Sequence, residues 1–279
     1  MTTELSDKQI QSYDRNGFLV FENFLDSSEL AHWRNTLDQA VAERLRTQAE
    51  APADAEMDYY KKVFVQCVNL WKTSDAIRTL ILDPRIGKLA ATLAGTAAIR
   101  MYHDHALIKP PWGNPTNWHI DNPEDPFHSR QQIMVWVALD EATMQNGCLC
   151  FLPGAHKLGD FDVKNNFHSG DVGGLFRDRP ELYKIEPSMA PMSAGDCVFI
   201  SGMVPHAAGA NMTPRPRRAM ACLLMPEEAR YNGNPSSLPR EYADTLAVGD
   251  PLVDDRYVPQ LWPVAELYGN ACPPAQHLH

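Results

Sequence analysis

The amino-acid sequence predicts a mainly β protein, an antiparallel sandwich or barrel with flanking helices. From residue 97 onward, short apolar and β-branched runs are separated by Gly, Pro, Asn and Asp, as in antiparallel sheets. Helical patterns occupy the first third, and residues 227–279 are rich in turn-forming residues. A length of 279 residues is compatible with one elaborated β domain. We therefore expect one domain, with 1–96 as mostly helical support, 97–226 as the β core and 227–279 as a loop-rich wrap.

The first third begins with two predicted helices separated by a strand. Ser6 can cap a helix that the chain leaves through Asn16-Gly17, and the apolar run 18–21 predicts a short strand. Residues 26–29 have capping-box spacing, which predicts a second, long amphipathic helix ending near Glu50. Its apolar residues recur at helical intervals, at Leu30, Trp33, Leu37 and Val41. Because that stripe is apolar, we expect it to cover a sheet.

The remaining elements are two helices and a series of strands. The β-branched and aromatic run 62–68 predicts a strand. Helices are predicted at 74–82 and 84–93, the second with Pro84 at the favoured first position and Gly95 behind it. In the β core, apolar runs between turn residues predict strands at 98–108, 132–139, 148–152, 196–201 and 218–225.

Composition and charge exclude several classes of function. Apolar residues make up 44% of the chain and charged residues 22%, so a sizeable core can form. The net charge of -10 opposes nucleic-acid binding, and we expect no nucleic-acid partner. The sequence shows neither a signal peptide nor an apolar run long enough to span a membrane, so we expect a cytoplasmic protein without a membrane partner. In that compartment the six cysteines should remain thiols.

The tripeptide His119-Ile120-Asp121 gives the first indication of a metal site. Side chains alternate along a strand, so this imidazole and carboxylate should project to the same side. His206, shortly after the strand at 196–201, supplies a third candidate. Two histidines and one carboxylate occupy one face of an octahedron and leave three positions open for a chelating oxoacid and dioxygen. That pattern is typical of iron(II) oxygenases and not of structural zinc sites.

Arg217 is the candidate for binding the oxoacid. It stands at the start of the predicted strand 218–225, eleven residues after His206. A guanidinium that points into a barrel is costly unless it meets an anion, and its planar fork matches a carboxylate. The far carboxylate of 2-oxoglutarate would satisfy this arginine. Arg215 and Arg218 are rivals, although Arg218 would face the opposite side of the strand.

Several separated stretches resemble the phytanoyl-CoA dioxygenase family, over about residues 6–263. The run 13–24 is similar to the family's entry segment, and 108–111 followed by His119-Ile120-Asp121 is similar to its first metal strand. The runs 136–140, 146–149 and 152–157 resemble the most recognisable block of the family. The last similar block is Ala194-Gly195-Asp196 with His206, Asn211, Thr213 and Arg217.

The resemblance implies a double-stranded β-helix, that is, a cupin-like jelly-roll barrel, and a set of cofactor ligands. Iron would be bound by His119, Asp121 and His206. 2-Oxoglutarate would be held by Arg217 and lined by Trp136 and Met101. In relatives a lysine or glutamine on the preceding strand often assists, and Lys62 and Gln66 are equal candidates here.

Four other positions are informative. Ala208 departs from the family pattern, since relatives commonly place a small hydroxyl residue there, near the oxoacid carboxylate. His156 belongs to a turn in that pattern, and we expect it to be structural. His103 and His105 alternate on one face of their strand and could line the pocket beside Met101 or sit at its polar end.

The predicted activity is oxygenation of a small molecule. The resemblance implies a dioxygenase that uses Fe(II), dioxygen and 2-oxoglutarate, hydroxylates an aliphatic C–H of a metabolite or natural product, and releases succinate and CO2. Asp121 is present where halogenating relatives have a small residue. Desaturation or cyclisation by the same chemistry, a zinc hydrolase and a non-catalytic binding barrel are the alternatives. We expect a monomer or homodimer whose substrate is selected by residues 160–183 and the tail after Tyr231.

Overall fold

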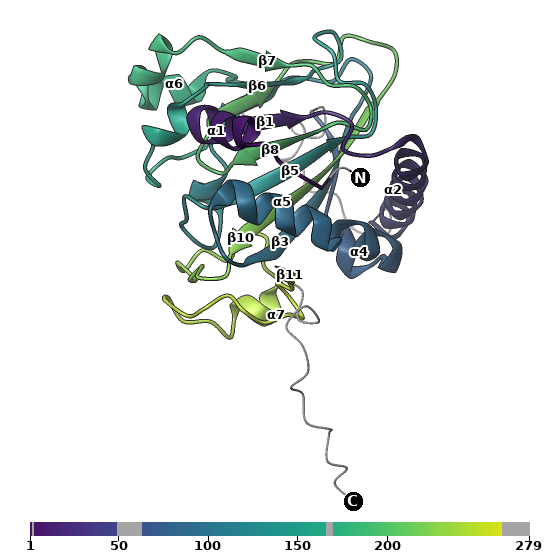
Figure 1. Cartoon of the computed structure of the whole chain (residues 1–279). Helices are drawn as coiled ribbons and strands as arrows, with labels where there is room; N and C mark the ends of the chain where they lie inside the picture. The colour runs from purple at the N-terminus through teal and green to yellow at the C-terminus, as the bar shows by residue number, and fades with distance from the viewer. Residues whose placement is uncertain (2, 49–62, 166–169, 264–279) are drawn as a thin grey trace, which may run out of the picture.

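The β core consists of two antiparallel sheets that face each other. A computed structural model describes residues 1, 3–48, 63–165 and 170–263 (Figure 1). The larger sheet has the strand order β1-β8-β5-β10-β3-β11, with β2 also paired to β3, and the smaller sheet has the order β4-β9-β6-β7. The strands are β1 Phe18–Phe21, β2 Val65–Val68, β3 Ile99–Lys109, β4 Thr116–His119, β5 Ile133–Ala138, β6 Leu149–Phe151, β7 Ser188–Ala190, β8 Cys197–Ser201, β9 His206–Ala208, β10 Arg217–Pro226 and β11 Gln260–Trp262.

Helices from the first third pack on the outer face of the larger sheet (Figure 1). The α-helices are α1 Asp7–Asn16, α2 Ser27–Gln48, α4 Asp75–Ile81, α5 Pro84–Ala94, α6 Gly174–Asp178 and α7 Arg240–Ala243, and the 3-10 helices are η2 Leu70–Lys72, η3 Asn122–Glu124, η4 Ala155–Lys157 and η5 Pro180–Lys184. The apolar stripe of α2 is buried at Trp33, Leu37 and Val41 in the same cluster as strand residues of the larger sheet. The predicted role of this stripe is confirmed.

Local capping chemistry explains where the first helices begin and end. Ser6 and Gln9 form a reciprocal capping box at the start of α1, and Gly17 ends that helix with φ of 81°, a left-handed conformation that glycine adopts without strain. The Asp83 side chain accepts the backbone N–H of Arg85 at the start of α5, and Gly95 ends that helix in the same left-handed region. These signals are local in sequence, which is why the sequence predicts both helices.

Strand β10 separates the two hydrophobic layers of the molecule. Met220, Cys222 and Leu224 belong to the layer under the helices. Ala219, Ala221 and Leu223 alternate with them and belong to the layer between the two sheets. Because both faces are covered, the strand is apolar along nearly its whole length. The inner layer, between the sheets, is the one that reaches the functional site.

The strand expected to carry both His119 and Asp121 ends at His119, and Asp121 has a helical backbone conformation before η3, so that expectation is wrong for Asp121. Four short strands, β4, β7, β9 and β11, lie outside the predicted ranges. They are three or four residues long, and their pairing with distant strands, not their own composition, makes them strands. Lys62, the first residue of the strand predicted at 62–68, lies outside the described residues, as does the expected end of α2 near Glu50. The segment after residue 227 contains α7 and β11 and otherwise irregular backbone up to residue 263.

Two further expectations concern the membrane and the cysteines. Among the helices that the structure describes, none is long and apolar enough to cross a bilayer. Five cysteines are free and buried, at Cys67, Cys148, Cys150, Cys197 and Cys222, and Cys272 lies outside the described residues.

Candidate metal centre and cosubstrate cavity

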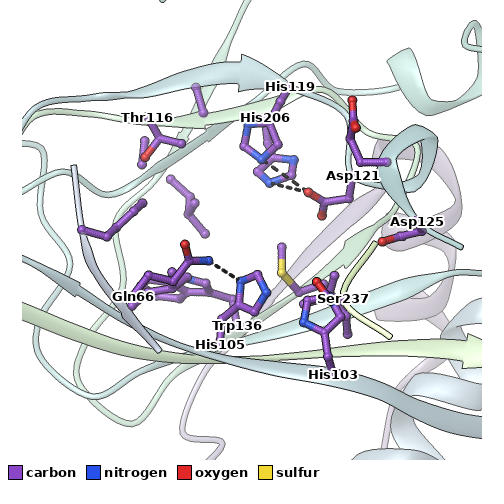
Figure 2. Close-up of a pocket in the computed structure, with 18 of the residues that line it drawn as sticks. Gln66, His103, His105, Thr116, His119, Asp121, Asp125, Trp136, His206 and Ser237 are labelled. Atoms are coloured by element: carbon purple, nitrogen blue, oxygen red, sulfur yellow. Dashed lines mark hydrogen bonds and ion pairs between the residues drawn. The ribbon is translucent and has the colours of Figure 1, made fainter. Parts of the chain in front are cut away.

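Three side chains from the smaller sheet converge at one end of the β core (Figure 2). His119 ends β4, His206 begins β9, and the two residues are direct partners across these strands. Asp121 follows β4 in a helical backbone conformation at the start of η3. Its Oδ1 lies 3.4 Å from Nε2 of His119 and 3.9 Å from Nε2 of His206. One donor atom from each of these residues lies within 4.8 Å of the others, which is the separation that ligands of a single ion need.

The other ring nitrogen of each histidine is anchored to the backbone. Nδ1 of His119 lies 2.7 Å from the carbonyl oxygen of Asn117, and Nδ1 of His206 lies 3.1 Å from that of Val204. A carbonyl oxygen only accepts hydrogen bonds, so each Nδ1 carries the proton and each Nε2 offers its lone pair. Backbone anchoring of this kind is typical of histidines that ligate a metal.

The protonation states of His206 and Asp121 also favour metal binding. Burial, followed by the neighbouring His119, lowers the pKa of His206 to about 4, so its imidazole is neutral at neutral pH. Burial raises the pKa of Asp121, but His206 and His119 outweigh it and bring that pKa to about 2. Oδ2 of Asp121 is buried and makes no hydrogen bond to any described residue. A buried carboxylate with a free oxygen, beside the neutral imidazole of His206 and Nε2 of His119, fits a divalent cation.

Arg217 lies on the facing sheet and needs an anion. Its side chain is 1% exposed, and Nε and both terminal nitrogens have no hydrogen-bond partner among the described residues. Its guanidinium lies over the Trp136 ring, 5.0 Å from the centroid. Burial lowers the pKa of Arg217 to about 10, so the side chain remains charged at neutral pH. A carboxylate ligand would satisfy this buried cation, and the arginine therefore fits an oxoacid.

Neither of the two rival arginines lines the cavity described below. Arg218 binds Asp140 through Nε and Nη2 and Asp38 through Nη1, on the opposite side of β10. Arg215 is exposed in the loop before that strand.

A buried lysine accompanies Arg217 and was not identified from the sequence. Lys109 is fully buried and stands directly opposite Arg217 in the β3–β10 pairing. Its Nζ donates to the carbonyl of Asn114 at 2.6 Å and lies over the Phe64 ring. Burial, and then Arg217, lower the pKa of Lys109 to about 7. Lys109 and Arg217 therefore face each other across a strand pair, and among the described residues neither side chain forms an ion pair with a carboxylate.

A cavity of about 320 Å³ connects the three converging side chains with Arg217. It lies between the two sheets (Figure 2), and the segment 236–237, from the C-terminal tail, also lines it. The polar and charged lining residues are Gln66, His103, His105, Thr116, His119, Asp121, Glu124, Asp125, His206, Arg217, Ser236 and Ser237. The apolar lining residues are Phe64, Leu107, Met134, Trp136, Leu149, Ala207, Ala208 and Leu223.

Of the residues predicted to assist at the cosubstrate, Gln66 and Trp136 line this cavity. Gln66 Nε2 lies 3.0 Å from Nδ1 of His105. Lys62, the other candidate for the assisting role, lies outside the described residues. His103 and His105 line the cavity, with ring centroids 4.3 Å apart. His156 is remote from it, and its Nε2 contacts the carbonyl oxygen of Asp14.

Met101 is not where the sequence suggested. It is fully buried in the layer under the helices and does not line the cavity. The reason is a β-bulge. Leu223 pairs with His103 and Leu224 with Met101, so Tyr102 is an extra residue in β3 and the alternation of side chains changes there. His103 therefore faces the cavity while Met101 faces the helices.

Other lining residues were missed because their position depends on long-range pairing. Thr116, Phe64, Leu149, Leu223 and the 236–237 segment reach the cavity from five different parts of the chain. The sequence offered a signal for Thr116 only: it lies three residues before His119, in the same short strand, which places it near the candidate metal ligand. For the 236–237 segment the sequence carries no comparable signal.

The cavity has an iron-type ligand set on one wall. On the other wall lies a buried arginine whose nitrogens have no hydrogen-bond partner among the described residues. Within a jelly-roll fold, this combination defines the class of non-haem iron oxygenases that use a 2-oxo acid. Comparison with known families agrees: the Phytanoyl-CoA dioxygenase (PhyH) family profile matches residues 13–219. The chain belongs to this family.

Individual relatives are similar over most of their length. Methylphosphonate hydroxylase from Gimesia maris is 29% identical over 227 residues, which is 79% of this chain and 80% of the relative. Human peroxisomal phytanoyl-CoA dioxygenase is 25% identical over 242 residues, 81% of this chain and 70% of the relative.

Solved structures extend the similarity. The α-ketoglutarate-dependent carbocyclase SnoK from nogalamycin biosynthesis superposes with a TM-score of 0.75 at 25% identity, covering 93% of this chain and 98% of that one. The epimerase SnoN, solved with Fe3+, α-ketoglutarate and nogalamycin RO, has a TM-score of 0.73 at 29% identity, covering 91% of this chain and 98% of that one.

These findings confirm the predicted fold and class of enzyme. The chain is an iron- and 2-oxoglutarate-dependent dioxygenase that acts on a small molecule. The zinc-hydrolase alternative finds no support among these relatives.

Proposed function

We propose that His119, Asp121 and His206 hold the ferrous ion, that Arg217 binds the far carboxylate of 2-oxoglutarate, and that the substrate is hydroxylated at an aliphatic carbon. The observation that carries this proposal is the buried Arg217 guanidinium, whose nitrogens have no partner among the described residues. It opens into the same cavity as the three candidate iron ligands.

The bound iron would couple oxidative decarboxylation of 2-oxoglutarate to hydroxylation, so that one oxygen atom of O2 ends in succinate and the other in the product alcohol. The protein's own contribution is placement. His119 and His206 present their Nε2 atoms from two paired strands, and with a carboxylate oxygen of Asp121 these atoms would hold the ion. Asp121 would supply a carboxylate ligand where halogenating relatives have a small residue, so hydroxylation is the outcome that we propose.

At the cosubstrate end, Trp136 supports the Arg217 guanidinium from one side and fixes its plane. Gln66, one of the two candidate assisting residues, lines the cavity, and we propose it for the assisting role. Its contact with His105 holds both side chains at the cavity wall.

The substrate we propose is a small polar metabolite. The end of the cavity away from Thr116 is lined by Asp125, Ser237 and His103, which offer hydrogen-bonding groups close to Asp121 (Figure 2). Nδ1 of His103 is buried without a partner in the described part of the chain. Such a wall favours a molecule with hydroxyl, amine or amide groups.

A second candidate outcome is ring formation or epimerisation of a natural product. The similarity to a carbocyclase and an epimerase, each covering more than 90% of this chain, favours it. Both outcomes use the same site and differ in how the substrate is held after C–H cleavage.

We also propose that the chain is one cytoplasmic domain and forms a monomer or homodimer. Both sheets share one inner apolar layer, which supports a single folding unit for the described residues. Light scattering on the purified protein measures its oligomeric state.

The direct test is succinate release from 2-oxoglutarate under air, across a panel of small polar metabolites and natural products, with Fe(II) supplied. We expect at least one compound to raise succinate formation and to gain an oxygen atom by mass spectrometry, unless cyclisation or epimerisation replaces hydroxylation. His206→Ala should abolish turnover, whereas His128→Ala, at an exposed histidine, should retain it. Turnover that persists in His206→Ala, or without 2-oxoglutarate, would overturn the proposal.

A further inference from the structure

Ala208 lines the cavity two residues after His206, and Arg217 lines it from the facing sheet. The methyl group of Ala208 can neither donate nor accept a hydrogen bond. This position of β9 therefore offers no hydrogen bond to a carboxylate at Arg217.

Thr116 lies directly across the strand pair from Ala208. The two residues are partners in the β4–β9 register, so their side chains emerge on the same face of the smaller sheet. Both line the same cavity. In Figure 2, Thr116 lies at the cavity end that holds Gln66 and Trp136, away from Asp125 and Ser237. A hydroxyl at position 116 can thus reach the space that a hydroxyl at position 208 would serve.

The Thr116 hydroxyl has no partner in the described structure. Oγ1 is buried, and it makes no hydrogen bond to any described residue. Valine has the same shape as threonine without the polar atom. A buried hydroxyl without a partner therefore makes the fold less stable than valine would at this position. A buried, unsatisfied donor that faces a cavity points to a ligand with an acceptor.

The acceptor follows from the facing wall. The nitrogens of Arg217 are also buried and without partners in the described part of the chain. A carboxylate has two oxygens and about four lone-pair sites, so a guanidinium that binds it side-on leaves room for another donor. Arg217 and Thr116 are donors on opposite walls of one cavity, and a carboxylate between them would satisfy both.

We propose that the Thr116 hydroxyl, from β4, donates a hydrogen bond to the far carboxylate of 2-oxoglutarate bound at Arg217. Thr116 is then a positioning residue for the cosubstrate. This inference rests on the proposed role of Arg217.

The test measures binding and not turnover. The full chain, loaded with Fe(II) without oxygen, is titrated by calorimetry with 2-oxoglutarate and, separately, with oxalate, which chelates a metal but has no far carboxylate. Thr116→Val should weaken 2-oxoglutarate binding by about tenfold, the loss expected for one hydrogen bond to a charged group, and change oxalate binding less than twofold. Thr116→Ser, which keeps the hydroxyl, should bind 2-oxoglutarate within about threefold of wild type.

A swap of the hydroxyl provides the decisive control. Adding Ala208→Ser to Thr116→Val returns a hydroxyl from the partner strand and should restore most of the lost 2-oxoglutarate affinity. The inference is overturned if Thr116→Val binds 2-oxoglutarate like wild type, or if 2-oxoglutarate and oxalate weaken together and Ala208→Ser restores neither. Failure of the proposed function would look different, because the wild-type protein itself would then bind oxalate but show no preference for 2-oxoglutarate.

Discussion

Replacing Lys109 by methionine should stabilise the protein without ligand and weaken its grip on 2-oxoglutarate. Lys109 is fully buried and faces Arg217 across β3 and β10, so the two cations repel each other inside the core. Methionine keeps a similar length and volume but removes the charge. The dianionic cosubstrate would remove the same conflict in the wild-type protein, which is why the two effects should have opposite signs.

The size of the effect follows from the pKa of the lysine. Burial and Arg217 lower this pKa from 10.5 to about 7, so the charged form costs up to about 4 kcal/mol at pH 7. The methionine variant also loses the hydrogen bond to the Asn114 carbonyl, which reduces the gain in stability by about 2 kcal/mol. We therefore expect Lys109→Met to raise the free energy of unfolding by about 2 kcal/mol, or roughly 5 °C in Tm.

Thermal unfolding with a chelator present, from pH 7 to pH 10, measures this effect. The folded pKa lies below the unfolded one, so the unfolded chain binds more protons between these values and wild-type stability rises with pH. The gap between variant and wild type should accordingly narrow as pH rises. Lys88→Met, at an exposed lysine on α5, is the matched control and should change little. A Lys109→Met protein less stable than wild type, or a gap that does not depend on pH, would refute the reasoning.

Three further predictions concern the site. Arg217→Met should weaken 2-oxoglutarate binding by about 100-fold in calorimetry, because it removes the charge and the paired donors. Arg218 binds Asp140 and Asp38 instead, so Arg218→Met should leave that affinity within about threefold. Iron affinity should fall as the pH is lowered toward the pKa of His206, which burial brings to about 4, because protons then compete for its Nε2; dialysis followed by metal analysis measures this, and iron retention that is the same at pH 7 and below pH 4 would contradict it. Met101→Leu should leave the affinity for 2-oxoglutarate unchanged, since Met101 packs under the helices. Trp136→Leu should raise the dissociation constant of 2-oxoglutarate about fivefold, again measured by calorimetry.

Elements with local signals could be predicted from the sequence. The Ser6 capping box, Gly17 and Pro84 determine helix ends through contacts within a few residues, and both helices form where expected. The candidate iron ligands could also be proposed, because His119 and Asp121 are only two residues apart in sequence and His206 follows a recognisable strand.

Features that depend on pairing between distant segments could not be predicted. The bulge at Tyr102 turns Met101 toward the helices and away from the cavity, and no residue type in β3 predicts this bulge. Thr116 becomes a site residue only through its register with Ala208, and Lys109 becomes a buried cation only through its register with Arg217. Side-chain direction in a sheet is determined by register, and register is determined by the partner strand.

A crystal structure of the protein with Fe(II) and 2-oxoglutarate, grown without oxygen, tests the central claim most directly. We predict one iron bound by Nε2 of His119, Nε2 of His206 and a carboxylate oxygen of Asp121, with the far carboxylate of 2-oxoglutarate against the Arg217 guanidinium. An ion bound elsewhere, or a cosubstrate whose far carboxylate points away from Arg217, would contradict it.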